Sequence, residues 1–543
     1  MKRPYTYLLL AVLVMLPALA CGFSSDGPPR NAVVVEVVAN TSLTPWLESA
    51  VATFNEQEAE VEEGRPVYVE LSATDAGQAV TEITGGATPD LWIPDHEVWV
   101  HLLANEGVDS YQNDCAVVAQ SPLVIAMWRP LAESLGWPGR DLGWLDVGSL
   151  AADPGAWEYY SGGQFGDTLR LGHTHPGLSA TGASTLLALV QAAESQTEAV
   201  SVEEVQQPIV QASIGAFEGA VAWFSSDTAT LAQTMRERGV QFLGAAVIYE
   251  SDVVQYGGGD PEIVPIYPFE GTFVAQHAAC ANGDGDAEAA AVFRDYLRSE
   301  EAQALAVEAG LRPVNDEVSA GAPLDETGGV DLSQPEVTFA SPTVDTLFAV
   351  QDVWQSARKD VNLVMLLDVS GSMAGEKIEN VRRAAVQFVE QMGDDDYISI
   401  IAFSSEPMPI VGHRPIAGNR EKIAAAIEGL EAEGDTTLYD AIGDGATLLS
   451  ETTSSETANA MVVLSDGLDT GSFRYDPAGA TAAVVDTGAT VFTIAYGSDA
   501  DEALMEEIAV QANGNFFRGD EASIAAIYQE MSAAFGGSVG VGR

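Results

Sequence analysis

Leu363-Val-Met-Leu-Leu-Asp368-Val-Ser370-Gly-Ser372 is the stretch that decides the fold of the carboxyl-terminal part of this chain. Its first five residues form a continuous apolar run of the kind that a parallel sheet buries on both faces. Apolar side chains then recur at helical spacing between residues 376 and 392. Asp368, Ser370 and Ser372 therefore lie on a strand-to-helix turn, at the edge where open α/β sheets place their ligands. Carboxylate and hydroxyl oxygens suit a hard divalent cation.

The residues after this turn alternate between predicted strands and helices. Such alternation indicates βαβ units and a doubly wound parallel sheet, so the predicted fold class is α/β. The predicted strands are residues 397–403 and 491–495, and the predicted helices are residues 420–430, 502–512 and 524–535.

Two further motifs complete the predicted cation site. Gly434-Asp435-Thr436-Thr-Leu438 leads into a helical stretch, and a later strand ends at Ser465-Asp466-Gly467. With the Asp-x-Ser-x-Ser turn before them, these motifs resemble, in the same order, the metal-ion-dependent adhesion site of von Willebrand factor type A (VWA) domains. The resemblance covers residues 360–536 and implies a Rossmann-like, doubly wound domain.

The resemblance also implies roles for five side chains. Ser370, Ser372 and Thr436 would ligate a Mg²⁺, Mn²⁺ or Ca²⁺ ion directly, while Asp368 and Asp466 would hold it largely through water molecules. In that family, the remaining coordination position is offered to an acidic side chain of a partner protein.

The chemistry of this site is that of an incompletely neutralised ion. A dication held mainly by neutral hydroxyls keeps more of its positive charge than one surrounded by carboxylates, so an outside carboxylate still gains by binding it. Asp435 stands where the family usually has glycine. Its carboxylate either turns toward the ion and weakens the attraction for a partner, or points to solvent.

The same turn does not match common catalytic motifs. A P-loop needs Gly-x4-Gly-Lys-Ser/Thr, and Gly371 and Gly375 are too close together for it. A serine hydrolase needs Gly-x-Ser-x-Gly, which the turn does not contain. We therefore expect a binding protein and not an enzyme.

Residues 1–20 have the pattern of a signal peptide. Two basic residues precede an apolar run over residues 8–16, and Ala18-Leu-Ala20 then meets Cys21. Cys21 and the small residues after it resemble the start of a bacterial lipoprotein, with a lipid on Cys21 and a tether over residues 21–32. Ala-x-Ala is also a plain signal-peptidase site, so secretion without a lipid is the alternative. We expect an exported protein anchored at the cell membrane or envelope.

The number of cysteines indicates the redox compartment of the protein. Of the 3 cysteines, lipidation consumes Cys21 and leaves Cys115 and Cys280, which we predict to form a disulfide in an oxidising compartment. Two unrelated buried thiols are the alternative.

The formal net charge is −57, from 80 acidic and 23 basic residues. Nucleic acid is excluded as a partner, because such a surface cannot neutralise phosphates.

Residues 33–313 form a second predicted unit. Small hydroxyl residues occur at three expected strand-to-helix turns, where they would present donors to a cleft. With hinge-like strands at residues 121–127 and 266–275, the unit resembles the two-lobed type 2 periplasmic solute-binding fold. By this resemblance, the candidate contacts to a small-molecule solute are Ser42, Thr74, Ser179 and Thr181. The alternative is that these hydroxyls only cap helices.

The remaining segments connect these units. Residues 314–359 are interpreted as an exposed linker followed by a docking helix, and residues 537–543 as a flexible tail. The sequence thus predicts an exported, lipid-anchored protein whose VWA module recognises a protein partner and whose solute-binding-like module can bind a small ligand. The alternative is a solute receptor of an ATP-driven transporter, with the VWA domain as a docking accessory.

Overall fold

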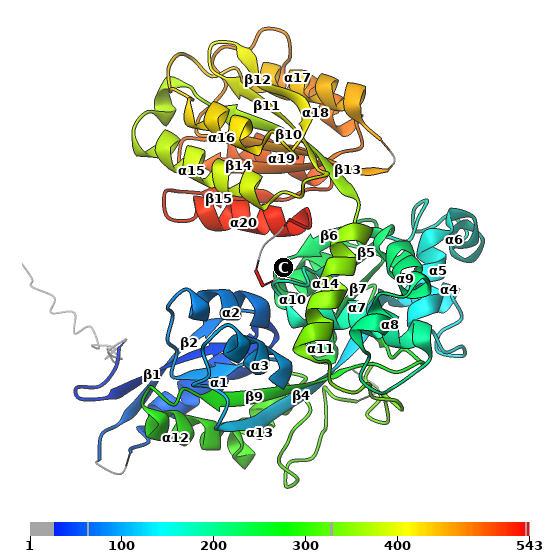
Figure 1. Ribbon diagram of the computed structural model, residues 1–543, viewed down its shortest axis with the longest axis vertical. Helices are drawn as coiled ribbons and strands as arrows, with labels where there is room; N and C mark the ends of the chain where they lie inside the picture. Colours follow the sequence, from blue (N-terminus) through cyan, green and yellow to red (C-terminus); the bar gives the residue numbers. More distant parts are fainter. Residues whose placement is uncertain (1–26, 62–63, 326–328, 455, 538–539, 542–543) are drawn as a thin grey trace, which may run out of the picture.

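The computed structural model describes residues 27–61, 64–325, 329–454, 456–537 and 540–541. The predicted signal peptide and Cys21 lie outside these residues. Figure 1 shows two lobes built from the earlier part of the chain and a third body built from the carboxyl-terminal part. The predicted α/β class is confirmed, because each body combines a sheet with covering helices.

The carboxyl-terminal body contains a 6-stranded sheet with strand order β12-β11-β10-β13-β14-β15. Neighbouring strands are parallel, except that the edge strand β12 is antiparallel to β11. The strands are β10 (Asp360–Asp368), β11 (Tyr397–Phe403), β12 (Pro407–Pro415), β13 (Thr457–Ser465), β14 (Thr490–Tyr496) and β15 (Phe516–Gly519). The helices are the 3₁₀-helix η3 (Gly371–Met373), α15 (Glu376–Gln391), α16 (Arg420–Glu428), α17 (Leu438–Thr452), α18 (Pro477–Val485), α19 (Glu502–Gln511) and α20 (Ile524–Ala534).

Side chains of β10 alternate between two hydrophobic layers. Leu363, Met365 and Leu367 pack in the layer that includes α15, α16 and α20. Val364 and Leu366 pack on the opposite face with α17, α18 and α19. A strand that is buried on both faces explains the continuous apolar run of the sequence, and helices on both faces confirm the doubly wound arrangement.

The two lobes share one 9-stranded sheet through the long strand β4 (Cys115–Trp128). Residues 115–122 of β4 pair with β9 in the first lobe, and residues 123–128 pair with β7 and β8 in the second. The first-lobe strands are β1 (Val33–Ala39), β2 (Val67–Ala73), β3 (Leu91–Ile93) and β9 (Val274–Ala281). The second-lobe strands are β5 (Leu171–Thr174), β6 (Val221–Ser225), β7 (Ala245–Tyr249) and β8 (Ile263–Ile266).

Helices cover the sheet in both lobes. Those of the first lobe are the 3₁₀-helix η1 (Thr41–Leu43), α1 (Thr44–Gln57), α2 (Ala76–Thr84), α3 (Glu97–Asn105), α12 (Ala287–Leu297) and α13 (Glu300–Glu308). Those of the second lobe are α4 (Arg129–Ser134), α5 (Trp144–Ala152), α6 (Pro154–Ser161), α7 (Ala180–Glu194), α8 (Val202–Val205), α9 (Pro208–Glu218), α10 (Thr228–Arg238) and α11 (Glu250–Tyr256). The strand-to-helix turns of β1, β2 and β5 meet between the lobes, which places the predicted cleft there.

Cys115 and Cys280 are register partners on the antiparallel strands β4 and β9. Their Cα atoms are 4.0 Å apart, and a disulfide joins them. The bond therefore ties the start of the crossing strand to the core strand of the first lobe.

The segment over residues 314–342, which its composition predicts to be exposed, is partly buried. Leu324, Val330 and Phe339 are each less than 5% exposed. The backbone of this segment pairs with Thr272 just before β9, since Thr272 N donates to Val337 O at 3.1 Å and Phe339 N donates to Thr272 O at 2.9 Å. The linker thus packs against the hinge region. Its apolar side chains pack against residues that are distant in the sequence, so the composition of the segment does not reveal the burial.

The described residues of the 537–543 stretch, expected to be a flexible tail, contact the solute-binding-like lobes. His175 Nε2 lies 2.7 Å from Gly537 O, and Val541 N donates to Gly177 O at 2.8 Å. Gly540 has φ +73°, and a Cβ atom there would lie 2.1 Å from Gly177 O. The absence of a side chain at this position permits the close approach, a packing reason that composition alone does not reveal.

One continuous hydrophobic cluster joins the second lobe to the carboxyl-terminal body. Trp223 of β6 stacks on Phe492 of β14, with ring centroids 5.5 Å apart. Between the bodies runs α14 (Val344–Ala357), whose Trp354 Nε1 donates to the buried Glu218 Oε2 at 3.1 Å. In Figure 1 this helix lies beside the second lobe, below the carboxyl-terminal body. The two modules therefore meet through a packed interface as well as through the chain.

A large aromatic residue at this interface should contribute measurably to stability. Trp223 is 5% exposed, and truncation of a buried aromatic ring typically costs about 3 kcal/mol or more. We expect Trp223→Ala to lower the free energy of unfolding of the full chain, measured by denaturant titration, by about 3 kcal/mol. Tyr159, which is 82% exposed, provides the matched control, and Tyr159→Ala should change stability by less than ~0.5 kcal/mol. Equal shifts in the two variants would contradict the packed interface.

Candidate functional site

The candidate metal centre lies where the loops after β10 and β13 meet. These strands are parallel neighbours, with Leu367 opposite Leu464. Asp368 at the end of β10 and Ser465 and Asp466 at the end of β13 therefore leave the sheet side by side. The carboxyl edge of a parallel sheet is the place at which this fold class binds ligands.

A chain of short hydrogen bonds links four of the five predicted site residues. Ser370 N donates to Asp368 Oδ1 at 2.8 Å, and Ser370 Oγ lies 2.9 Å from Ser372 Oγ. Ser372 Oγ in turn donates to Asp466 Oδ1 at 2.6 Å. Asp368 Oδ2 accepts from Ser465 Oγ at 2.6 Å, so both of its oxygens are held in place.

Thr436 reaches the same place from the loop before α17. The loop is fixed by Gly371 N, which donates to Gly434 O at 3.0 Å, and by Thr436 N, which donates to Thr470 Oγ1 at 3.0 Å. A Cβ atom placed on Gly467 would lie 3.8 Å from both Ser372 Oγ and Thr436 Oγ1. The structure therefore brings all five predicted residues together around one small volume, next to a residue without a side chain.

The donor set consists of two carboxylates and three hydroxyls. Oxygen donors of this kind fit Mg²⁺, Mn²⁺ or Ca²⁺ better than softer metals. Across the described ranges, no group of three or more His, Cys, Asp or Glu side chains is placed to hold a metal ion. This site differs from such groups because hydroxyls supply most of its donors. Burial raises the pKa of Asp368, while hydrogen bonds from Ser370 and Ser465 oppose that shift.

Lys377 is a member of the site that the sequence motifs do not reveal. It lies in the first turn of α15, and its Nζ contacts Asp466 Oδ2 at 2.5 Å. The contact joins residues 89 positions apart, so only the folded sheet brings them together. Asp466 is thus shared between a hydroxyl and an ammonium group.

Asp435 is exposed, and its backbone N–H donates to Ser405 Oγ at 3.1 Å. Of the two orientations left open by the sequence, the structure has the solvent-facing one. The residue therefore adds negative charge to the rim of the site and not to its interior.

The solute-contact candidates lie between the two lobes, with one exception. Ser179 and Thr181 are buried, and their hydroxyls lie 3.2 and 2.9 Å from Thr228 Oγ1. Ser42 Oγ of the first lobe donates to Asp252 Oδ2 of the second at 2.9 Å. Thr74 is only half-buried, and its backbone N–H donates to Ala39 O. Three of the four candidates therefore border the interlobe contact.

Buried carboxylates are the feature of this region that the sequence analysis missed. Asp75, Asp95 and Asp252 are each no more than 2% exposed. Asp75 directly follows Thr74 and precedes a helix, so it looks like an ordinary N-cap in the sequence. Asp95 is buried beside Tyr249, and burial raises the pKa of its carboxyl group. Burial raises the pKa of Asp75 to about 6 and that of Asp252 to about 7.

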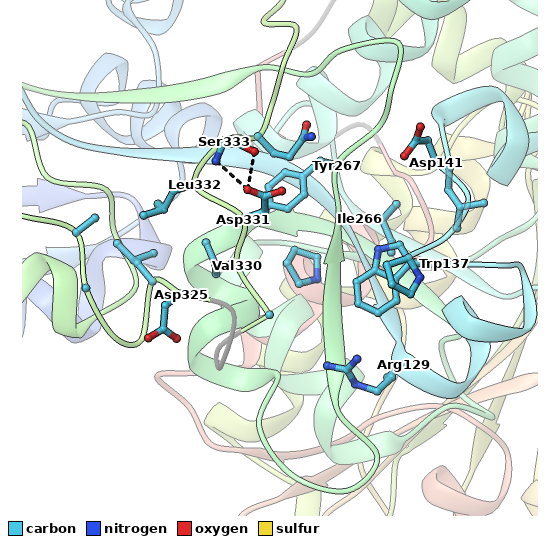
Figure 2. A pocket seen from close by; sticks show the side chains of 18 residues that line it. Arg129, Trp137, Asp141, Ile266, Tyr267, Asp325, Val330, Asp331, Leu332 and Ser333 are labelled. Carbon is cyan, nitrogen blue, oxygen red and sulfur yellow. Dashed lines mark hydrogen bonds between the residues drawn. The ribbon is translucent and has the colours of Figure 1, made fainter.

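A separate cavity of about 800 Å³ lies between the second lobe and the linker. Figure 2 shows Arg129 and Trp137 on one side of it and Asp331 and Ser333 on the other. Several of its polar groups are already paired, since Asp331 accepts from Ser333 and Arg129 Nε donates to Glu262 Oε2 at 2.6 Å. Tyr267 also donates from its hydroxyl to Glu250 Oε2 at 2.5 Å. We assign no function to this cavity.

Two family models match the chain, each on one of the modules just described. The model of the bacterial extracellular solute-binding proteins matches residues 35–312, and the model of the von Willebrand factor type A domain matches residues 362–530. The fold is thus that of a solute-binding domain followed by a VWA domain. The chain belongs to the family of bacterial extracellular solute-binding proteins.

The curated relatives match over part of the chain. An uncharacterized protein of Synechocystis sp. is 30% identical over 160 residues, which are 29% of this chain and 37% of that protein. The inter-alpha-trypsin inhibitor heavy chain H4 of Sus scrofa is 27% identical over 194 residues, which are 33% of this chain and 21% of that protein. The chain therefore spans well under half the length of these relatives.

Solved structures resemble the two modules separately. The periplasmic binding protein AfuA from Actinobacillus pleuropneumoniae, with fructose-6-phosphate bound, is 14% identical with a TM-score of 0.42 and covers 61% of this chain and 97% of its own. A von Willebrand factor type A protein from Catenulispora acidiphila is 20% identical with a TM-score of 0.30 and covers 32% of this chain and 42% of its own. Among the helices that the structure describes, none has the length and apolar character needed to span a bilayer.

The raised pKa of Asp252 predicts a pH dependence of stability. A folded-state pKa of about 7, above the ordinary aspartate pKa of 3.8, means that the folded protein binds this proton more tightly than the unfolded chain does. The contribution of this proton to the stability of the folded state is therefore fully present below pH 3.8 and is lost as the pH rises toward 7. Asp252→Asn should flatten this loss, because the amide oxygen can still accept from Ser42 Oγ and Tyr249 N. Thermal unfolding between pH 4 and 8 measures it, and a variant that follows the wild-type curve would refute the assignment.

Proposed function

We propose that the VWA domain binds a divalent cation, Mg²⁺, Mn²⁺ or Ca²⁺, and uses it to recognise an acidic side chain of a protein partner. The observation that supports this proposal is the convergence of Asp368, Ser370, Ser372, Thr436 and Asp466 at one edge of the sheet. When bound, the ion supplies positive charge that a partner's carboxylate can approach.

The five site residues have two different roles in this proposal. Ser370, Ser372 and Thr436 offer neutral oxygens, which leave much of an ion's charge uncompensated. Asp368 and Asp466 add the negative charge that retains the ion. Asp466 accepts from the Ser372 hydroxyl, and Asp368 accepts from the backbone N–H of Ser370, which fixes the loop that carries both serines. The hydroxyls of Ser370 and Ser372 contact each other and carboxylates, an arrangement suited to binding and not to nucleophilic catalysis.

We further propose that the solute-binding domain is exported with the VWA domain and takes a small-molecule ligand between its lobes. The family match supports an extracytoplasmic location, and the start of the sequence supports removal of residues 1–20 and lipidation of Cys21. The lipid would then hold both modules at the cell envelope.

A second candidate function is that of a solute receptor for an ATP-driven transporter, with the VWA domain as a docking accessory. The match over residues 35–312 favours it, because that stretch is the larger module. Calorimetric titration of the full chain with small solutes tests this second function: a transport receptor must bind a solute tightly, and the absence of binding would exclude it while leaving metal-dependent partner recognition by the VWA domain untouched.

Removal of two hydroxyl donors tests the metal-dependent function. We expect the Ser370→Ala, Ser372→Ala double variant to bind Mg²⁺ at least about tenfold more weakly, a change of about 1.4 kcal/mol, because two of three direct neutral donors are lost. Isothermal titration with MgCl₂ measures the affinity, and capture from envelope extract with and without chelator measures partner binding. Ser498→Ala, at an exposed serine, is the matched control. A partner retained equally by the double variant and in chelator would disprove the mechanism.

Lys377 should weaken metal binding, because its ammonium group occupies one oxygen of Asp466. Lys377→Met keeps most of the side-chain length but removes the charge, so we expect Mg²⁺ affinity to rise by roughly three- to tenfold. Lys422 on α16 is an exposed lysine in the same domain, and Lys422→Met should leave the affinity unchanged. Weaker binding in Lys377→Met would show instead that the lysine positions Asp466 for the ion.

A further inference from the structure

The carboxylate of Asp75 lies in the contact between the two lobes and is held from both sides. The residue follows β2 in the first lobe and is 1% exposed. Its Oδ1 accepts from Asn40 Nδ2 at 3.0 Å, Thr41 N at 3.2 Å and Thr41 Oγ1 at 2.6 Å, all in the first lobe. Its Oδ2 accepts from Thr228 N at 3.1 Å and Thr228 Oγ1 at 3.0 Å, both in the second lobe.

These donors form the kind of set that recognises a small oxyanion. Two backbone N–H groups, two hydroxyls and one amide surround a single carboxylate, and Thr228 N is at the first residue of the 11-residue helix α10. Backbone N–H groups at a helix start and hydroxyl donors are the groups with which proteins bind carboxylates, phosphates and sulfates. Here the anion is part of the chain itself.

The lobes are closed around this contact. Gln78 N donates to Leu178 O across the interface at 3.0 Å, and Ser42 Oγ donates to Asp252 Oδ2. A Cβ atom on Gly77 would lie 2.3 Å from Gly177 O, so the first turn of α2 lies directly against the opposite lobe. The predicted solute contacts Ser179 and Thr181 border the same donors through Thr228.

The charges that surround Asp75 are negative. Burial is the main cause that raises the pKa of Asp75, and the charge of Asp227, the N-cap of α10, raises it further. Burial likewise raises the pKa values of Asp95 and Asp252, and the charge of Asp75 adds to both shifts. A free anion entering this region would add to that repulsion. A tethered carboxylate has the advantage, because its effective concentration at the donors is high.

We propose that Asp75 is an internal ligand: it fills an oxyanion-binding set of donors shared by the two lobes and keeps the cleft closed without a solute. The ligand class of the vacated site is a small carboxylate or inorganic oxyanion. This inference rests on the proposal that the first module is a solute-binding cleft, and it is independent of the metal site.

Removal of the tethered carboxylate provides the test. In the full chain, Asp75→Ala leaves five donors without their acceptor, so its thermal midpoint should fall below that of the wild type. Sodium formate should then raise the midpoint of Asp75→Ala saturably and bind at least tenfold more tightly than to the wild type, whereas sodium chloride should not. Asp95→Ala is the matched control, because this acid is equally buried but accepts from none of the five donors that hold Asp75, and formate should not raise its thermal midpoint.

A second variant covers the case in which Asp75→Ala fails to fold. Asp75→Asn keeps the size of the side chain but turns one acceptor into a donor, so hydrogen exchange at the Thr228 amide should accelerate at least tenfold. Unchanged exchange there, or the failure of formate, acetate and sulfate to bind a folded Asp75→Ala, would overturn the inference. Wild-type protein that binds formate as tightly as the variant would also overturn it. Mg²⁺ titration of the same samples and binding of another solute to the wild type report on the proposed function separately.

Discussion

The parallel pairing of β10 with β13 is the constraint on which the metal centre depends. Leu367 lies opposite Leu464, so the two strands deliver Asp368 and the Ser465–Asp466 pair to the same edge of the sheet. A slip of one residue would turn every side chain of β10 to the other face. It would also separate Asp368 Oδ2 from Ser465 Oγ, which are now 2.6 Å apart. The apolar layers on both faces of β10 therefore hold the register that forms the site.

In both modules, the proposed site binds a carboxylate although the chain as a whole is acidic. The chain carries 80 acidic and 23 basic residues, so an acidic partner meets a repulsive surface unless a cation is held locally. A dication held by the hydroxyls of the VWA domain would supply this local positive charge. In the cleft, five donors accommodate a carboxylate that belongs to the chain. On both proposals, each site is organised around one carboxylate, which a partner would supply in the VWA domain and which Asp75 supplies in the cleft.

The sequence predicts the fold well because its signals are local: the apolar run of β10 and the motifs after it sit on neighbouring residues. Contacts between distant residues carry no such signal. Lys377 meets Asp466 across 89 positions, and Asp75 meets Thr228 across 153. The partial burial of the linker escapes prediction for the same reason, since Phe339 packs on Phe273, a residue far from it in the sequence. The interlobe role of Asp75 also could not be predicted, because the residue lies directly before a helix, where a capping role is the ordinary interpretation.

The proposed metal centre requires a divalent ion among Ser370, Ser372 and Thr436, and anomalous diffraction from crystals of the full chain grown with MnCl₂ can locate that ion. We predict a manganese peak bordered by these three hydroxyls, with Asp368 and Asp466 nearby and Lys377 displaced from Asp466. A map with manganese elsewhere, and with Lys377 still bound to Asp466, would contradict the proposed metal centre.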